Sequence, residues 1–185
     1  NQTVPPSIMC VYEDSERNLW IGSYTKGVAT IDRRTGKCSY LNSLKDSKGK
    51  SVQRVYSLAE DSNKRLWIAS MGSGIFYYDM KAKDIKFPKE INRDNRWVNC
   101  LIYSPRDKKI YAGNYDGINC IDISQENSFN NEIILRKHIV YSLYQDKKGI
   151  LWAGTSEGLV SVDTKTKKID KYTIKEGLSG NTVYA

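Results

Sequence analysis

The sequence predicts an all-β fold, a β-propeller of four blades with four antiparallel strands in each. Three markers repeat in register: an aromatic residue in a short apolar run, a glycine, and an aspartate. They fall at Trp20, Trp67, Tyr111 and Trp152; at Gly27, Gly74, Gly117 and Gly158; and at Asp32, Asp79, Asp122 and Asp163. A period in the forties is typical of propeller blades, because each unit buries its faces only against its neighbours.

The second unit shows the expected elements most clearly. Residues 55–59 and 66–69 form two strands around a polar turn, and residues 75–78 and 85–87 form two more. Glycines in the loop 71–74 allow a positive φ, and Asp79 opens a basic turn. Short apolar runs separated by such turns are hairpin signals.

The other units repeat this order, so the blades are expected at about residues 7–41, 52–87, 97–123 and 138–173. The segments 41–53, 87–96 and 124–137 are expected to be long polar connections. The third unit departs most, because Tyr111 replaces Trp and Pro105 stands in a turn where the other units carry Asp. Residues 181–185 are expected to begin a further blade, which makes the chain part of a larger propeller.

The formal charge is +8, and much of the excess lies in turns after the first and third strands. In an up-and-down blade these turns emerge on one side, so one face is expected to be positive. Such a face is either a solvated surface or an attractor of acidic partners, headgroups or anionic ligands. No nucleic-acid-binding motif accompanies the charge, so we expect no nucleic acid partner. No apolar run reaches the length of a membrane span.

Four cysteines, Cys10, Cys38, Cys100 and Cys120, lack metal-ligand spacing, and His138 is the only histidine. We interpret the cysteines as small buried residues whose disulfide status the sequence leaves open. No nucleophile, zinc or phosphate-loop motif is present, so no catalytic residue, metal or cofactor is assigned.

The repeated residues themselves are expected to be structural. Each aspartate before a turn accepts hydrogen bonds from backbone N–H groups two residues further on. The strand tryptophans are expected in the core, and Gly22, Gly113 and Gly154 leave room for blade packing.

Binding residues should instead differ from unit to unit, on the loops between second and third strands and on the connections between blades. The candidates are Tyr24, Arg54, Met71, Arg96, Trp97, Tyr115 and His138. The aromatic residues offer flat faces to sugar C–H groups, and the arginines offer forked donors to hydroxyls, carboxylates or sulfates.

The repeat closely resembles the two-component-regulator propeller repeat. Units one, two and four carry the motif best, at residues 13–28, 60–75 and 145–159, and residues 176–184 resemble the lead into a next repeat. The resemblance implies part of a seven-bladed propeller in the periplasmic sensor region of a Bacteroides-type hybrid histidine kinase. Such sensors are anchored in the inner membrane, and many recognise oligosaccharides and switch on the genes that use them.

The resulting hypothesis is a ligand-sensing propeller without enzymatic activity, whose ligand is an oligosaccharide, including an acidic or sulfated one. Two alternatives remain: a protein-interaction scaffold, and a propeller lyase or hydrolase. Because four blades leave two blade faces uncovered, self-association as a homodimer is also expected, with two arcs closing a ring.

Overall fold

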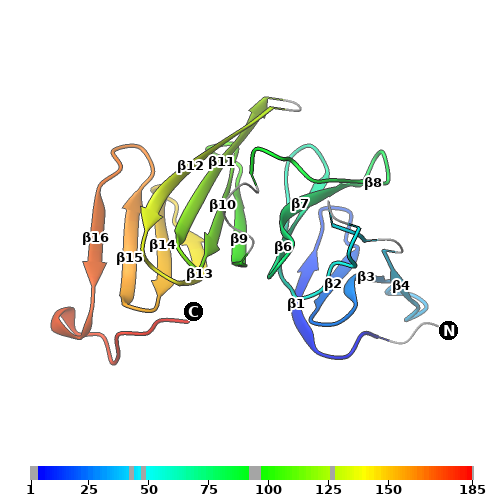
Figure 1. Cartoon of the computed structure of the whole chain (residues 1–185), viewed down its shortest axis with the longest axis horizontal. Helices are drawn as coiled ribbons and strands as arrows, with labels where there is room; N and C mark the ends of the chain where they lie inside the picture. The colour runs from blue at the N-terminus through cyan, green and yellow to red at the C-terminus, as the bar shows by residue number, and fades with distance from the viewer. Residues whose placement is uncertain (1–3, 42–43, 47–48, 92–96, 126–127, 185) are drawn as a thin grey trace. The chain divides into compact units, whose positions relative to one another are not determined.

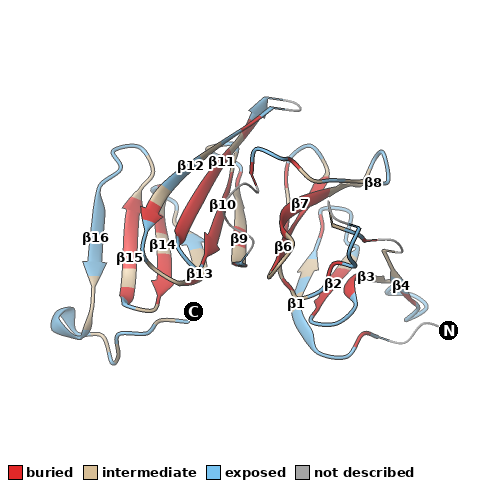
Figure 2. Cartoon of the chain, viewed as in Figure 1, coloured by how far each residue is buried: buried red, intermediate tan, exposed pale blue. Residues whose placement is uncertain are grey.

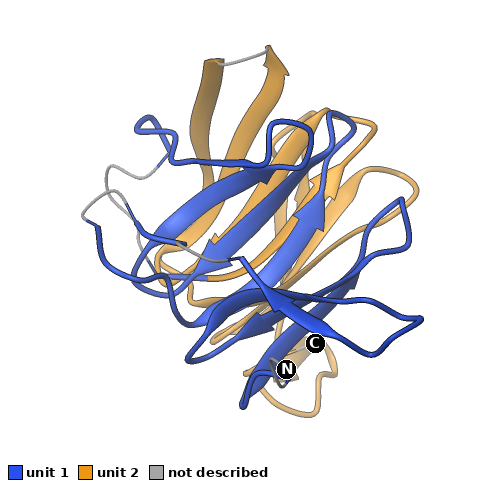
Figure 3. Ribbon diagram, turned by 90° about the vertical axis from the view of Figure 1, so that its right-hand side faces the viewer, with its two compact units in different colours: residues 1–98 blue, residues 99–185 orange. Residues whose placement is uncertain are grey.

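The computed structural model describes residues 4–41, 44–46, 49–91, 97–125 and 128–184 (Figure 1). These residues form four antiparallel sheets of four strands each, and every sheet keeps the order of the chain. We call the sheets blades 1 to 4. The predicted all-β fold of four-stranded propeller blades is therefore confirmed. The chain divides into two compact units, Asn1–Val98 and Asn99–Ala185 (Figure 3).

Blades 1 and 2 make up unit 1. Blade 1 contains β1 (Ile8–Glu13), β2 (Leu19–Ser23), β3 (Gly27–Ile31) and β4 (Cys38–Tyr40), and blade 2 contains β5 (Val55–Glu60), β6 (Arg65–Ser70), β7 (Gly74–Asp79) and β8 (Asp84–Lys86). The second strand of blade 2 is buried along its whole length (Figure 2). The outer strands β4 and β8 have three residues each.

Blades 3 and 4 make up unit 2. Blade 3 contains β9 (Val98–Ser104), β10 (Lys109–Asn114), β11 (Gly117–Gln125) and β12 (Ser128–Arg136), and blade 4 contains β13 (Val140–Gln145), β14 (Ile150–Thr155), β15 (Gly158–Asp163) and β16 (Ile169–Tyr172). A short 3₁₀ helix, η1 (Ile174–Glu176), follows blade 4.

One expectation about the segments needs correction. The stretch 124–137 was expected to be a polar connection, but most of it is β12, a nine-residue strand that pairs with β11 in a long hairpin (Figure 1). The polar run from Asn130 to Glu132 concealed the strand, because an outer strand has one solvated face and tolerates such residues. The described residues 181–184, where a further blade is expected to begin, form no strand ladder. Val183 donates its N–H to the carbonyl of Thr155 at 2.9 Å, and its own carbonyl meets Gly154 as the carbonyl of Val55 meets Gly22.

Each unit has its own apolar core between its two blades. In unit 1, Trp20 and Val28 of blade 1 pack with Val55, Leu66 and Phe76 of blade 2. Two residues of the connection between these blades, Leu44 and Val52, join this core, so that segment is anchored although its sequence is mostly polar.

In unit 2 the core cluster joins Tyr111 and Ile118 of blade 3 to Val140, Leu151 and Val162 of blade 4. The inner strands β14 and β15 are mostly buried along their length, whereas the outer strand β16 is mostly exposed (Figure 2).

The turn aspartates adopt the predicted role. Asp14, Asp61 and Asp146 each accept a hydrogen bond at 2.8–3.0 Å from the N–H two residues on. The same bond forms after the third strands, at Asp32, Asp79, Asp122 and Asp163.

The three carboxylates of the first turns also bind the strand tryptophans. Trp20 donates its indole N–H to Asp14 at 2.8 Å, Trp67 to Asp61 at 2.7 Å, and Trp152 to Asp146 at 3.2 Å. These contacts explain why the aspartate and the tryptophan repeat together.

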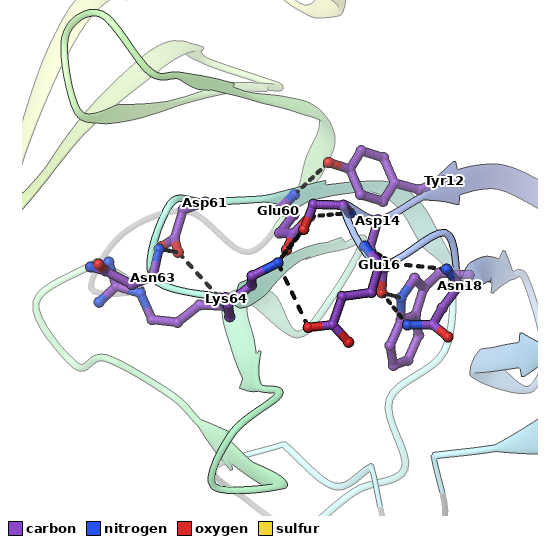
Figure 4. A network of polar contacts seen from close by, with 11 residues as sticks. Tyr12, Asp14, Glu16, Asn18, Glu60, Asp61, Asn63 and Lys64 are labelled. Atoms are coloured by element: carbon purple, nitrogen blue, oxygen red, sulfur yellow. Dashed lines mark hydrogen bonds and ion pairs between the residues drawn. The ribbon is translucent and has the colours of Figure 1, made fainter.

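The blades of unit 1 are also joined by a polar network at their first turns (Figure 4). The backbone N–H of Glu60 donates to the hydroxyl of Tyr12 at 3.0 Å. The Glu60 carboxylate accepts from both the N–H and the hydroxyl of Ser15 at 2.6 Å, and Lys64 lies 3.4 Å away. Part of the basic turn charge is therefore neutralised within the blade pair.

Glycines permit the close approach of neighbouring blades, as predicted. A Cβ on Gly22 would lie 2.8 Å from Val55 Cγ1, and one on Gly113 would lie 2.5 Å from Val140 Cγ1. Gly154 meets the carbonyl of Val183 in the same way, at 2.7 Å. Real Cβ atoms do not approach other atoms so closely, so each site needs glycine.

Candidate ligand-binding site

Backbone hydrogen bonds join the loops and connections of unit 1 into one row, which we call the loop row. Tyr24 donates its N–H to Ser7 at 3.0 Å, Arg54 to Tyr24 at 2.8 Å, and Met71 to Arg54 at 2.9 Å. An isolated bridge then pairs Met71 with Trp97. Four of the predicted binding residues, Tyr24, Arg54, Met71 and Trp97, are thus brought together on a fixed backbone.

Arg54 is the central residue of the loop row. Its guanidinium carbon lies 6.0 Å from the centre of the Trp97 ring, which is a cation–π arrangement. The side chain is half-buried, and no carboxylate among the described residues pairs with it. Gly72 lies beneath the guanidinium, where an added Cβ would be 3.5 Å from a guanidinium nitrogen.

The backbone of Arg54 has a left-handed conformation with φ = 52°. Ser7, which holds the equivalent place before the first strand of blade 1, has φ = 56°. The equivalent residue in blade 4 is Ile139, because the carbonyls of Ser7, Arg54 and Ile139 accept the same loop hydrogen bond. Because serine and isoleucine also occupy this position, the blade does not need an arginine there. Left-handed conformations of non-glycine residues are enriched at functional sites.

Two large aromatic side chains of the loop row are open to solvent. Tyr24 is 44% exposed and Trp97 is 48% exposed, whereas the strand tryptophans Trp20 and Trp67 are buried. An exposed ring beside an unneutralised guanidinium offers an apolar platform and a forked donor to one ligand.

The two remaining described candidates, Tyr115 and His138, lie in unit 2. The N–H of Lys137 donates to the carbonyl of Asp116 at 2.8 Å, which brings the neighbouring Tyr115 and His138 to the same loop edge. Tyr115 is 47% exposed. Arg96, the seventh candidate, lies outside the described residues.

His138 has one satisfied ring nitrogen and one that lacks a hydrogen bond within the described structure. Its Nδ1 donates to the carbonyl of Arg136 at 2.8 Å, while its buried Nε2 lies 3.9 Å from Glu157. Lys171 donates to the same carboxylate at 2.8 Å. The hydrogen bond from Lys171 and the charge of that lysine hold the pKa of Glu157 below its ordinary value of 4.5, with a smaller contribution from His138.

Glu157 and Lys171 line a shallow pocket in unit 2 together with Ser156, Thr173, Ile174 and Asn181. The sequence predicted binding residues on the loop that carries Glu157, between the second and third strands. It did not indicate Lys171, which lies on the outer strand β16. Only the pairing of β15 with β16 brings that lysine to the loop edge.

Among the described residues, no group of three or more His, Cys, Asp or Glu side chains could hold a metal ion. The cysteines there are free thiols, with Cys38 and Cys120 buried and Cys10 and Cys100 partly buried. We also find, in that part of the chain, no helix with the length and apolar character that a membrane crossing requires.

The fold resembles several solved structures. The extracellular domain of the proposed hybrid two component system BT3049 from B. thetaiotaomicron has 19% identity and a TM-score of 0.61, with 95% of this chain and 30% of that chain covered. PorZ, a surface component of the type-IX secretion system of Porphyromonas gingivalis, has 15% identity and a TM-score of 0.73, with 96% and 29% covered. The chain thus spans less than a third of either protein.

A gluconolactonase of Xanthomonas campestris, XC5397, has 10% identity and a TM-score of 0.67, with 88% of this chain and 60% of that chain covered. At these identities the likenesses concern the fold alone. No match to a curated protein sequence was found.

The two component regulator propeller family model matches residues 4–25, 46–72 and 135–157. These segments cover the first strands and second strands of blades 1, 2 and 4. None of them covers β9 to β11 of blade 3, where Tyr111 and Pro105 depart from the repeat. Three segments of the chain, centred on the first two strands of blades 1, 2 and 4, are thus similar to repeats of the two component regulator propeller family.

Proposed function

We propose that this chain is part of the ligand-sensing propeller of a hybrid two-component histidine kinase and that it acts by binding rather than by catalysis. The family of its repeats supports this proposal, as does its likeness to the extracellular domain of a proposed hybrid two component system. The same two findings support an extracytoplasmic, periplasmic location for the chain in a membrane-anchored parent.

The proposed ligand is an oligosaccharide that carries a carboxylate or sulfate. The observation that supports it is the half-buried Arg54 guanidinium stacked over the exposed Trp97 ring, with Tyr24 exposed in the same loop row. The aromatic faces would cover sugar C–H groups, and the guanidinium would bind the acidic group in bidentate fashion. Because backbone hydrogen bonds fix the row, little ordering is needed on binding.

A thermal-shift experiment on the protein tests this function. The probes are tetragalacturonate, which is acidic, and cellotetraose, which is neutral and of similar length. Binding to the native state raises the melting temperature by mass action. We expect tetragalacturonate to raise it more than cellotetraose. A wider panel would add sulfated sugars. Absence of a shift with every glycan in that panel would contradict oligosaccharide sensing by these blades.

Two variants separate the proposed roles of the loop row. Arg54→Gln should remove the advantage of the acidic probe and leave the neutral one unaffected. Trp97→Ala should weaken both. The matched control is Tyr184→Phe, a change at a side chain that is 69% exposed in unit 2. Equal losses from all three variants would show an effect on stability rather than on the site.

A protein-interaction scaffold is the second candidate function, and self-association is its simplest form. The supporting observation is apolar exposure on first strands: Ile8, Met9 and Val11 of β1 are 46%, 39% and 58% exposed, and Tyr144 of β13 is 64% exposed. Such patches favour association. Sedimentation velocity at micromolar concentration should then show a dimer, and a monodisperse monomer would contradict it.

A further inference from the structure

Ser39 in blade 1 and Glu132 in blade 3 hold equivalent positions on their outer strands. In both blades the register runs outward from the aromatic marker: Trp20, Thr30 and Ser39 in blade 1, and Tyr111, Cys120 and Glu132 in blade 3. The equivalence therefore rests on strand pairing and not on sequence alignment alone.

Lys83 in blade 2 and Lys167 in blade 4 are also equivalent. Each stands four residues after the aspartate that closes the third strand, Asp79 or Asp163. Each has a left-handed backbone, with φ = 54° for Lys83 and 62° for Lys167. The two turns therefore direct the chain in the same way at these lysines.

In unit 2 the equivalent pair forms an ion bridge between the two blades. Lys167 Nζ lies 2.9 Å from the Glu132 carboxylate. In unit 1, Lys83 and Ser39 line one groove, and a serine hydroxyl stands where blade 3 has a carboxylate. Lys83 has no acidic partner among the described residues. Unit 1 thus has the cation of this bridge without its anion.

The other charged groups of the groove add to the positive field. Arg33 and Arg34 line it, and Arg34 has no carboxylate partner in the described part of the chain. Arg33 pairs with Glu13, which also serves Arg17 at 3.5 Å. Two arginines therefore share the Glu13 carboxylate, and Arg34 remains without one.

The two carboxylates that line the groove are engaged elsewhere. Asp32 accepts hydrogen bonds from the N–H groups of Arg34 and Thr35 at 2.9 and 3.0 Å, which hold its pKa below the ordinary value of 3.8. Glu16 lies 3.7 Å from Lys64. Neither acid is directed at Lys83 by these contacts.

We propose that this groove of unit 1 binds an acidic segment of a partner polypeptide, whose glutamate or aspartate carboxylate takes the place that Glu132 takes in unit 2. A polypeptide is the favoured source because the carboxylate of unit 2 is itself a strand side chain beside the same lysine. The outermost strand β4 has only three residues and leaves the groove open. One exposed ion pair contributes little alone, so the affinity depends on Lys83, Arg33 and Arg34 together.

Fluorescence anisotropy with a labelled peptide of ten glutamates tests the proposal, and a peptide of ten glutamines is the probe control. We expect binding of the glutamate peptide that weakens as salt is raised. The double variant Lys83→Gln and Arg34→Gln should bind about tenfold more weakly. Lys81→Gln is the matched control, because Lys81 lies in the same turn but does not line the groove.

A second variant fills the site without removing a cation. Ser39→Glu places in blade 1 the carboxylate that blade 3 has, and it should abolish peptide binding while the fold is kept. Equal weakening by Lys81→Gln and by the double variant would overturn the proposal. Binding of decagalacturonate with no binding of the glutamate peptide would overturn the polypeptide assignment. The loop-row variants should not affect this assay, so its outcome is independent of the proposed function.

Discussion

The hydroxyl of Tyr111 donates a hydrogen bond to the Asp107 carboxylate at 3.0 Å, and this pair replaces the Asp–Trp pair of the other blades. Ser104, which is buried, accepts from the N–H of Asp107 at 3.2 Å. Gln145 of blade 4 donates to the same carboxylate at 2.7 Å. In blade 3, Ser104 therefore accepts the hydrogen bond of the turn and Asp107 accepts that of the aromatic residue, whereas in the other blades one aspartate accepts both.

Tyr111→Phe is expected to lower the free energy of unfolding by about 1–2 kcal/mol, because a partly buried carboxylate loses a donor. Urea denaturation followed by circular dichroism measures the change. Tyr144→Phe is the control, since Tyr144 is 64% exposed and should change the midpoint little. An equal effect of the two variants would exclude a specific role for the Tyr111–Asp107 bond.

Gly22→Ala should destabilise unit 1 by about 1–3 kcal/mol through overpacking. The added Cβ would lie 2.8 Å from Val55 Cγ1 and 2.9 Å from the Val55 carbonyl, both in the next blade. Thermal unfolding of the variant and of Gly180→Ala should differ clearly, because a Cβ on Gly180 meets nothing within 4 Å. A small effect at Gly22 would mean that the blades can separate without cost.

The free energy of unfolding should decrease in acid, because the turn aspartates become protonated there. Burial by itself would raise the pKa of Asp14, but hydrogen bonds from Trp20 and Asn18 hold it below the ordinary 3.8. The pKa of Asp107 is lowered in the same way, by Gln145 and Tyr111. A depressed folded pKa contributes stability above the unfolded pKa, and this stability is lost as the pH falls through the folded pKa.

The urea midpoint should therefore change little through these groups between pH 7 and pH 5 and should decrease below about pH 4. Asp14→Asn should be less stable at pH 7 and should lose less on acidification. Parallel curves for the variant and the parent would argue against Asp14 as a source of the acid loss.

The cysteine thiols should be unreactive in the folded protein. Burial raises the pKa of Cys10 to about 11 and that of Cys100 to about 12, despite a backbone hydrogen bond that lowers each. At pH 8 only about one in a thousand of the Cys10 thiols, and fewer of the Cys100 thiols, would be thiolate, which is the reactive form. Titration with an aromatic disulfide reagent should detect them slowly in buffer and rapidly in guanidinium chloride. Rapid reaction in buffer would show that the first strands open.

Much of the blade architecture could be predicted from the sequence because the constraint is local and repeated. The spacing of Trp20, Trp67 and Trp152 fixed the second strands, and the aspartates before the turns indicated their own hydrogen bonds. The outer strand β12 was missed because a polar run, Asn130 to Glu132, interrupts its apolar residues and because its stability comes from pairing with β11.

The loop residues were predicted by their departure from the repeat, without knowledge of what they contact. That Arg54 stacks on Trp97 depends on a connection 43 residues further along the chain, and no local pattern indicates such a contact. The groove at Lys83 and Ser39 likewise depends on strand register, which only pairing defines.

The sequence by itself determined the class of fold, the blade period and the structural role of the repeated residues, because each blade uses the same local turns and strand pairings. Only the tertiary structure decided which variable residues meet. Within unit 1 it placed Arg54 over Trp97, and it left Lys83 without the carboxylate that Glu132 gives Lys167 in unit 2. The reason is physical: hydrogen bonds within a turn are specified by neighbours in the chain, whereas contacts between blades depend on how separate sheets pack.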